Sequence, residues 1–242
     1  MATRDSRQMA SLSSDPRQGL HSTAWTFEDR RAERERMVAT QIEARGIQEP
    51  LVLHAMRSVP REAFVPAGQA EFAYDDAPIP IGDGQTMSQP YIVALMASSL
   101  KLKPTDSVLE IGTGSGYEAA ILSTIAAQVY TVERVGRLAD SARRRLLQLG
   151  YGRVSVLEGD GSLGWRAHAP YDAILVTASG PLVPAALLEQ LVIGGRLIMP
   201  VGKVMGSQRL RRVTRTGDDD WEFENLQDVA FAPLIGAQGW PG

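Results

Sequence analysis

Residues 108–117, Val108-Leu109-Glu110-Ile111-Gly112-Thr113-Gly114-Ser115-Gly116-Tyr117, decide the fold of this chain. An apolar strand pattern leads into three glycines at alternate positions, and a helical pattern follows them. Glycines allow a tight turn and let a ligand approach the main chain closely. A strand, a glycine turn and a helix in this order indicate the ligand-binding edge of a parallel α/β sheet.

Downstream of this stretch, short apolar runs alternate with helical patterns. The apolar runs cover residues 107–111, 129–132, 154–157, 173–176 and 196–200. The helical patterns cover residues 117–125, 137–149 and 183–191. The alternation predicts an α/β fold of the Rossmann-like kind, with a mainly parallel, doubly wound sheet. Two further runs, at 209–214 and 226–230, predict an antiparallel C-terminal strand pair added to that sheet.

Upstream of the glycine stretch, the pattern predicts an N-terminal cap of helices and loops. Helices are expected over residues 27–45, 50–57 and 90–100. Thr26 suits the cap of the first helix, and Gly46 suits its end. Residues 60–90 are rich in proline and glycine and lack a clear period, and so long an irregular segment inside a compact domain is often functional.

The chain is expected to form one domain over residues 26–242. Within it we expect a helical and loop region at 26–102, a ligand-binding core at 103–202 and C-terminal strands at 203–242. Residues 1–25 are polar and lack the apolar centre of a signal peptide, so they predict a disordered tail. With no export signal and no apolar run of about 18 residues, we expect a cytoplasmic protein.

The composition excludes several kinds of active site and argues against nucleic acid as a partner. The 242 residues include no cysteine, which excludes disulfides, thiol nucleophiles and cysteine zinc sites. His21, His54 and His168 lie far apart, so no metal site is expected. A net charge of −3 gives no reason to expect nucleic acid as a partner, and we expect a monomer that binds neither nucleic acid nor membrane.

The glycine spacing and two acids predict the ligand. Glu133 lies 21 residues beyond Gly112, where a carboxylate can accept hydrogen bonds from ribose hydroxyls. The spacing Gly-x-Gly-x-Gly, with Gly114 and Gly116, differs from the Gly-x-Gly-x-x-Gly of dinucleotide binders. Glu110 would disfavour a phosphate and favour a cationic ligand. S-adenosylmethionine fits, while a nucleotide and a turn that serves only packing remain alternatives.

A second loop supports the same ligand. Glu158-Gly159-Asp160-Gly161 follows the third apolar run, at the edge where ligands bind in open α/β sheets. Asp160 can accept a hydrogen bond from the adenine amino group, with Gly161 beside it. The alternative is an ordinary surface turn, because aspartate and glycine favour turns.

Several blocks together resemble the protein-L-isoaspartate (D-aspartate) O-methyltransferase family over about residues 34–240. The upstream blocks are Glu35-Arg36-Met37, Arg45-Gly46-Ile47, Val59-Pro60-Arg61-Glu62-Ala63-Phe64-Val65-Pro66, Tyr74-x-Asp76-x-Pro78-x-Pro80-Ile81-Gly82 and Gly84-Gln85-Thr86-Met87-Ser88-Gln89-Pro90. The downstream blocks are Pro170-Tyr171-Asp172-Ala173-Ile174, Gly194-Gly195-Arg196-Leu197-Ile198-Met199-Pro200-Val201-Gly202 and Phe231-x-Pro233-Leu234. Met87 and Glu118 depart from the usual residues.

The resemblance implies a repair reaction on damaged proteins and peptides. A methyl group would pass from S-adenosylmethionine to the α-carboxylate of an L-isoaspartyl residue, leaving S-adenosylhomocysteine. The ester would close to a succinimide, which returns in part to aspartate. Ser88 would touch the reacting carboxylate and Thr86 would support it, although Ser88 alone also suits a helix N-cap before Pro90.

A free carboxylate is already ionised at neutral pH, because its pKa is about 3.5–4, so no general base is required. Three other readings stay open: a peptide-tailoring aspartate O-methyltransferase, a cofactor-binding adaptor without catalysis, and a nicotinamide-dependent oxidoreductase. The last is opposed by the glycine spacing.

Overall fold

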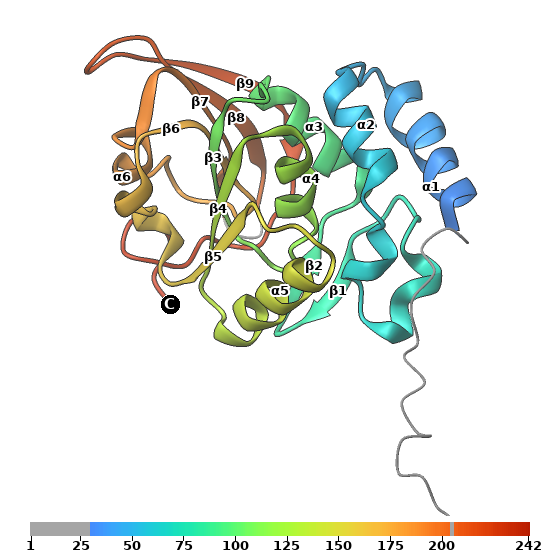
Figure 1. Cartoon of the computed structure of the whole chain (residues 1–242). Helices are drawn as coiled ribbons and strands as arrows, with labels where there is room; N and C mark the ends of the chain where they lie inside the picture. The colour runs from blue at the N-terminus through green and yellow to red at the C-terminus, as the bar shows by residue number, and fades with distance from the viewer. Residues whose placement is uncertain (1–29, 204–205) are drawn as a thin grey trace, which may run out of the picture.

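The computed structural model of the chain describes residues 30–203 and 206–242 (Figure 1). The predicted tail at 1–25, the Thr26 cap and the first residues of the predicted helix at 27–45 lie outside the described residues. No helix among the residues that are described combines the length and apolarity needed to cross a bilayer.

A seven-stranded sheet forms the centre, in the order β5-β4-β3-β6-β7-β8-β9. Its strands are β3 (Ser107–Ile111), β4 (Gln128–Glu133), β5 (Val154–Glu158), β6 (Tyr171–Val176), β7 (Leu191–Gly202), β8 (Gln208–Arg215) and β9 (Trp221–Val229). The pairs from β5 to β7 are parallel, and β7–β8 and β8–β9 are antiparallel. The predicted mainly parallel sheet with an antiparallel C-terminal pair is confirmed.

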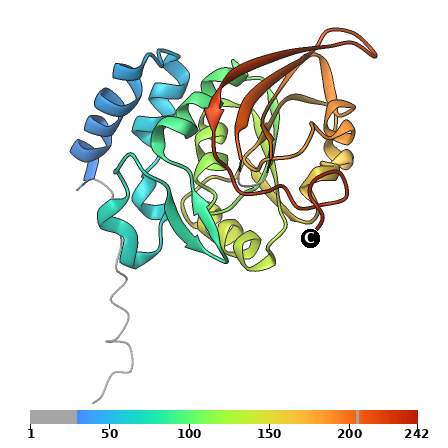
Figure 2. The same cartoon turned by 180° about the vertical axis from the view of Figure 1, so that it is seen from behind.

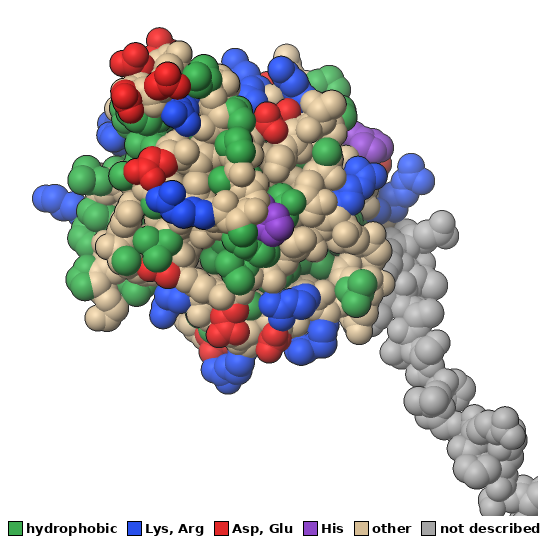
Figure 3. Space-filling model, turned by 60° about the vertical axis from the view of Figure 1, so that its left-hand side comes forward, with side chains coloured by type: hydrophobic (Ala, Val, Ile, Leu, Met, Phe, Trp, Pro, Cys, Tyr) green, Lys and Arg blue, Asp and Glu red, His purple; other side chains and the backbone are tan. Residues whose placement is uncertain are grey.

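The two faces of the sheet are covered differently (Figures 1 and 2). One face carries the larger apolar core, built with α3 (Pro90–Leu100), α4 (Tyr117–Ile125) and α5 (Gly136–Gln148). The other face packs against α6 (Ala185–Leu188) and the chain after β9. On the face drawn in Figure 3, acidic and basic side chains are interspersed among hydrophobic ones.

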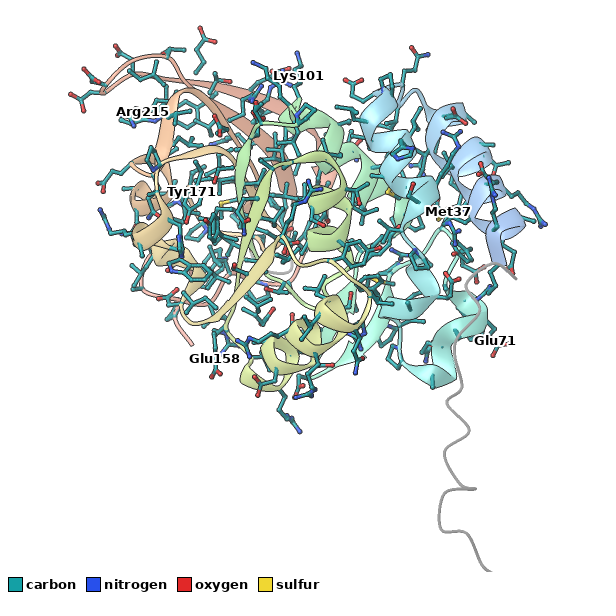
Figure 4. All side chains as sticks on the ribbon, in the orientation of Figure 1. Met37, Glu71, Lys101, Glu158, Tyr171 and Arg215 are labelled. Atoms are coloured by element: carbon teal, nitrogen blue, oxygen red, sulfur yellow. The ribbon has the colours of Figure 1, made fainter. Side chains whose placement is uncertain are left out.

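The N-terminal cap packs on the helical face. It comprises α1 (Arg31–Met37), the wide turn Val38–Ile42, the 3-10 turn Glu43–Arg45 and α2 (Pro50–Ser58). Gly46 ends the first helical run with a φ of 91°, as expected from the sequence. Met37 is buried and points from α1 into the core (Figure 4). The cap places residues 60–90 beside the glycine turn.

Two expectations about local structure were wrong. The helix predicted over residues 183–191 is only α6, because Pro184 stands at its start and the apolar residues from Leu191 onward extend β7. Residues 60–90 contain a short hairpin, β1 (Ile79–Gly82) and β2 (Gln85–Met87). Two prolines and two glycines hid its alternation, and positive φ angles at Gly82, Asp83 and Gly84 form the turn.

Candidate active site

A cavity of about 500 Å³ opens at the carboxyl ends of β3, β4 and β6. This is where the strand order changes direction, the usual ligand site of open α/β sheets. Its walls are parts of the glycine loop (residues 112–116), the acceptor loop (residues 85–89) and the C-terminal segment (residues 230–242), together with the ends of β4 and β9 and residues 177–178 after β6. The structure thus brings together loops that are far apart in sequence.

Gly112 shapes the floor of the cavity. Its φ is +97°, and a Cβ there would overlap the hydroxyl oxygen of Thr177. That hydroxyl donates a hydrogen bond of 2.9 Å to the Gly112 carbonyl, and the Gly112 N–H donates to Val132 at 2.8 Å. Only glycine combines this backbone conformation with this close approach.

Glu133 ends β4 and lines the cavity. Its Oε2 accepts a hydrogen bond of 2.9 Å from the Gly114 N–H, and its Oε1 accepts one of 2.9 Å from the Val135 N–H. The carboxylate therefore ties the glycine loop to the next loop while it faces the cavity. Each carboxylate oxygen has a second lone pair, so a ribose hydroxyl can still donate to it.

Gly116 has a different role from the other two glycines. It does not border the cavity; a Cβ there would lie 3.2 Å from Leu146 Cδ1 of α5. Its φ is +89°. This glycine permits close packing between α4 and α5.

Glu110 lies away from the cavity, contrary to the expectation from the sequence. It is fully buried on the helical side of β3, where its Oε2 accepts a hydrogen bond of 2.5 Å from the Thr131 hydroxyl. Burial raises the pKa of Glu110 to about 8, although the Thr131 bond lowers it. The carboxyl is largely protonated at neutral pH, so it offers no negative charge to select against a phosphate.

Asp160 holds the C-terminal segment. Its Oδ1 accepts from the N–H and hydroxyl of Ser162, and its Oδ2 accepts from the Ala237 N–H at 2.7 Å. Burial raises the pKa of Asp160, but these hydrogen bonds outweigh it and lower the pKa overall. Gly161 lines the cavity and packs so tightly on Ile111 that a Cβ would overlap it.

Ser88 and Thr86 both line the cavity from the acceptor loop. The Ser88 hydroxyl has no hydrogen-bond partner within residues 30–203 and 206–242. The N-cap of α3 is Gln89, which makes no side-chain cap bond, so the capping alternative for Ser88 is not realised. The hydroxyl is therefore free to donate to a ligand.

Three wall elements were not expected from the sequence: Thr177, Arg45 and residues 231–235. Thr177 directly follows β6, so its position at the carboxyl edge was a usable signal. Arg45 stacks 3.4 Å from the Tyr91 ring centroid and pairs with Asp76 at 2.9 Å. Residues 231–235 reach the cavity only through tertiary packing, which no local pattern reveals.

Comparisons with known proteins agree with this geometry. Residues 32–239 match the family model described as protein-L-isoaspartate (D-aspartate) O-methyltransferase. The chain belongs to this family. The predicted resemblance, drawn over about residues 34–240, is confirmed.

Members of the protein-L-isoaspartate O-methyltransferase family match along most of their length. One from Rhodopseudomonas palustris (strain HaA2) is 60% identical over 209 residues, covering 86% of this chain and 85% of the relative. One from Pelobacter propionicus is 59% identical over 207 residues, covering 86% and 92%.

Solved structures show the same fold. A protein-L-isoaspartate O-methyltransferase is 29% identical with a TM-score of 0.78, covering 85% of this chain and 67% of that one. A Plasmodium falciparum chain solved in complex with S-adenosyl-L-homocysteine is 24% identical, with a TM-score of 0.72 over 84% of this chain and 98% of that one. At that identity the second match speaks for the fold alone.

Proposed function

We propose that this protein transfers a methyl group from S-adenosylmethionine to the α-carboxylate of L-isoaspartyl residues in damaged proteins and peptides. One observation carries the proposal: a single cavity joins the glycine loop to the acceptor loop. The chain belongs to the protein-L-isoaspartate O-methyltransferase family, and a relative named for this activity is 60% identical to it; both observations support the proposal. The neighbouring backbone nitrogen then attacks the methyl ester and releases methanol, and the succinimide that forms hydrolyses in part to normal aspartate.

The cavity wall fits an adenosyl cofactor. Gly112, Gly114 and Gly161 offer a surface without side chains, and Glu133 faces the cavity as an acceptor for ribose hydroxyls. Asp160 is proposed to accept from the adenine amino group, although its oxygens already hold Ser162 and Ala237. Glu110 and Gly116 support the loop from behind and do not border the cavity.

In this reaction the residues of the cavity have to position the two reactants and do not have to transfer a proton. When bound, S-adenosylmethionine supplies a methyl group already activated by its sulfonium. The acceptor carboxylate is ionised at neutral pH and needs no general base. Ser88 is proposed to donate one hydrogen bond that orients the acceptor oxygen, and Thr86 to support the loop. The bond must stay weak, because strong stabilisation of the carboxylate would lower its reactivity.

The alternative, a peptide-tailoring enzyme that esterifies ordinary aspartate, is not favoured by the family match. Transfer of tritiated methyl groups to an isoaspartyl peptide, beside its aspartyl isomer, tests the proposal. We expect label on the isoaspartyl peptide only. Label on the aspartyl isomer would favour the tailoring reaction, and label on neither would contradict both.

We also propose that the protein works as a cytoplasmic monomer without nucleic-acid or membrane partners, with residues 26–242 as one domain. The net charge of −3, and the mixture of acidic and basic side chains on the face drawn in Figure 3, support the lack of a nucleic-acid partner. Light scattering on the purified chain tests whether it is a monomer, and cell fractionation tests whether it is cytoplasmic. A dimer mass or a membrane fraction would contradict them.

A further inference from the structure

Arg61 is buried beside the acceptor loop, in the 3-10 turn Arg61–Phe64, and does not itself line the cavity. Its side chain is 0% exposed. Its Nε donates to the Ala73 carbonyl at 2.7 Å, and its Nη2 donates to the Ser88 carbonyl at 2.7 Å. One buried guanidinium therefore holds the main chain of the residue whose hydroxyl faces the cavity.

The same guanidinium also lies over an aromatic ring at the start of α4. Its central carbon lies 4.9 Å from the ring centroid of Tyr117, the first residue of α4. Tyr117 follows directly after the glycine loop. Arg61 is thus in contact with the acceptor loop on one side and, on the other, with the ring of the first residue after the glycine loop.

This arrangement is costly, because a buried charge without a close counter-charge loses its hydration. Within the described part of the chain, no carboxylate lies within ion-pair distance of Arg61. Burial lowers the pKa of Arg61, with Tyr117 and Glu118 opposing the shift. Arginine stays protonated in proteins, so the two carbonyls and the aromatic ring must offset the cost.

We propose that Arg61 is a positioning residue, which fixes the acceptor loop against the glycine loop and so sets where the Ser88 hydroxyl lies. The proposal rests on the proposed function. Arginine suits the position because its planar fork reaches two carbonyls from separate segments while its central carbon lies over the Tyr117 ring; its Nη1 has no hydrogen-bond partner among the described residues. A lysine has one nitrogen and cannot replace all three contacts.

Arg34 provides a matched control. It is also buried, at 7% exposed, and lies on α1 of the N-terminal cap. It donates to the Arg57 carbonyl at 2.6 Å and to the Tyr74 hydroxyl at 3.1 Å, but it contacts neither Ser88 nor Tyr117. Arg34 therefore joins α1 to α2 and to Tyr74, whereas Arg61 bonds to the main chain of the acceptor loop.

The first test compares Arg61→Lys with Arg34→Lys in the full chain. For Arg61→Lys we expect kcat on an isoaspartyl peptide to fall about tenfold or more, because displacement of about 1 Å in a site can cost about a hundredfold. The KM and the Kd for S-adenosylhomocysteine should stay within about threefold of wild type, which is less than 1 kcal/mol. Arg34→Lys should lower Tm without this loss in kcat. Equal kcat in the two variants would overturn the proposal.

The second test needs no activity. Hydrogen exchange of the main-chain amides of residues 85–89 should be faster in Arg61→Lys than in Arg34→Lys, each measured equally far below its Tm. Equal exchange would overturn the positioning role. If both Arg61→Lys and Arg61→Gln fail to fold while Arg34→Lys folds, the role is purely structural and the proposal is wrong. An inactive wild-type enzyme would contradict the proposed function, while the exchange comparison would still decide the role of Arg61.

Discussion

The glycine loop and the acceptor loop border one cavity but are held in different ways. Main-chain and side-chain bonds both fix the first to the central sheet: the Gly112 N–H donates to Val132 at 2.8 Å, and Glu133 Oε2 accepts from the Gly114 N–H at 2.9 Å. The second pairs by its main chain only within the separate hairpin β1–β2, and its Ser88 carbonyl accepts a side-chain bond from Arg61. A cofactor that is the same in every turnover meets the edge of the central sheet. An acceptor that varies from one damaged protein to another meets the end of a two-stranded hairpin outside that sheet.

The largest effect on binding is expected from a substitution in the glycine loop. Gly112→Ala should weaken binding of S-adenosylhomocysteine about a hundredfold or more, because a Cβ would overlap Thr177 in addition to the cost of a positive φ. Gly150→Ala is the control: its φ is +83°, but nothing lies within 4 Å of a Cβ there. Calorimetric titration of both variants separates overlap from backbone strain. Equal affinities would contradict the close approach described for Gly112.

In the acceptor loop, Ser88→Ala should lower kcat without weakening cofactor binding. Without the bond that orients the acceptor oxygen, that oxygen should be misplaced, and a displacement of about 1 Å predicts a fall in kcat of about tenfold to a hundredfold. Affinity for S-adenosylhomocysteine should stay nearly unchanged. Ser98→Ala, on α3 and bonded only to the Leu95 carbonyl, serves as the control. Wild-type turnover in Ser88→Ala would remove Ser88 from the reaction.

Glu133→Ala should weaken binding of S-adenosylhomocysteine about tenfold, from loss of charge-assisted ribose bonds and of the bond to Gly114. Glu158 is its neighbour on β5, is exposed, and has its carboxylate beside Gly136 at the start of α5 and not in the cavity wall (Figure 4). Glu158→Ala should leave the affinity unchanged. Calorimetry on both variants decides whether Glu133 acts at the cofactor, since equal dissociation constants would exclude it.

The smallest effect concerns Glu110 and appears only as a pH dependence. Its pKa is raised to about 8 in the folded chain, so the unfolded chain ionises first as the pH rises. The contribution of Glu110 to stability should therefore fall between about pH 4.5 and pH 8, and Glu110→Gln should change the slope of Tm against pH in that range. Glu222→Gln, exposed on β9, is the control. Parallel Tm curves for wild type and Glu110→Gln would contradict the buried, protonated carboxyl.

The same contrast explains how far the sequence could predict the molecule. The predicted bounds agree with the structure for β3 (107–111), α4 (117–125) and α3 (90–100). These elements are largely buried, and buried elements have long apolar patterns that can be recognised in the sequence. The hairpin β1–β2 was missed, since prolines and glycines mask a pattern of only a few residues. Elements that depend on side-chain bonds between distant segments leave little local signal.

Site residues follow the same rule. Gly112 and Glu133 were predicted to face one ligand, and both line the cavity. Glu110 was expected to act through its charge, but alternation along β3 turns it toward the helical core, where burial keeps it protonated. Residues 231–235 and Arg61 act through tertiary contacts, so no spacing in the sequence could reveal them.

One measurement tests the shared cavity most directly. Calorimetric titration of the full chain with S-adenosylhomocysteine, beside a titration with NADH, should give binding at one site per chain for the first and none for the second. Heat from NADH alone, or no binding of S-adenosylhomocysteine at millimolar concentration, would contradict a glycine loop built for an adenosyl sulfonium cofactor.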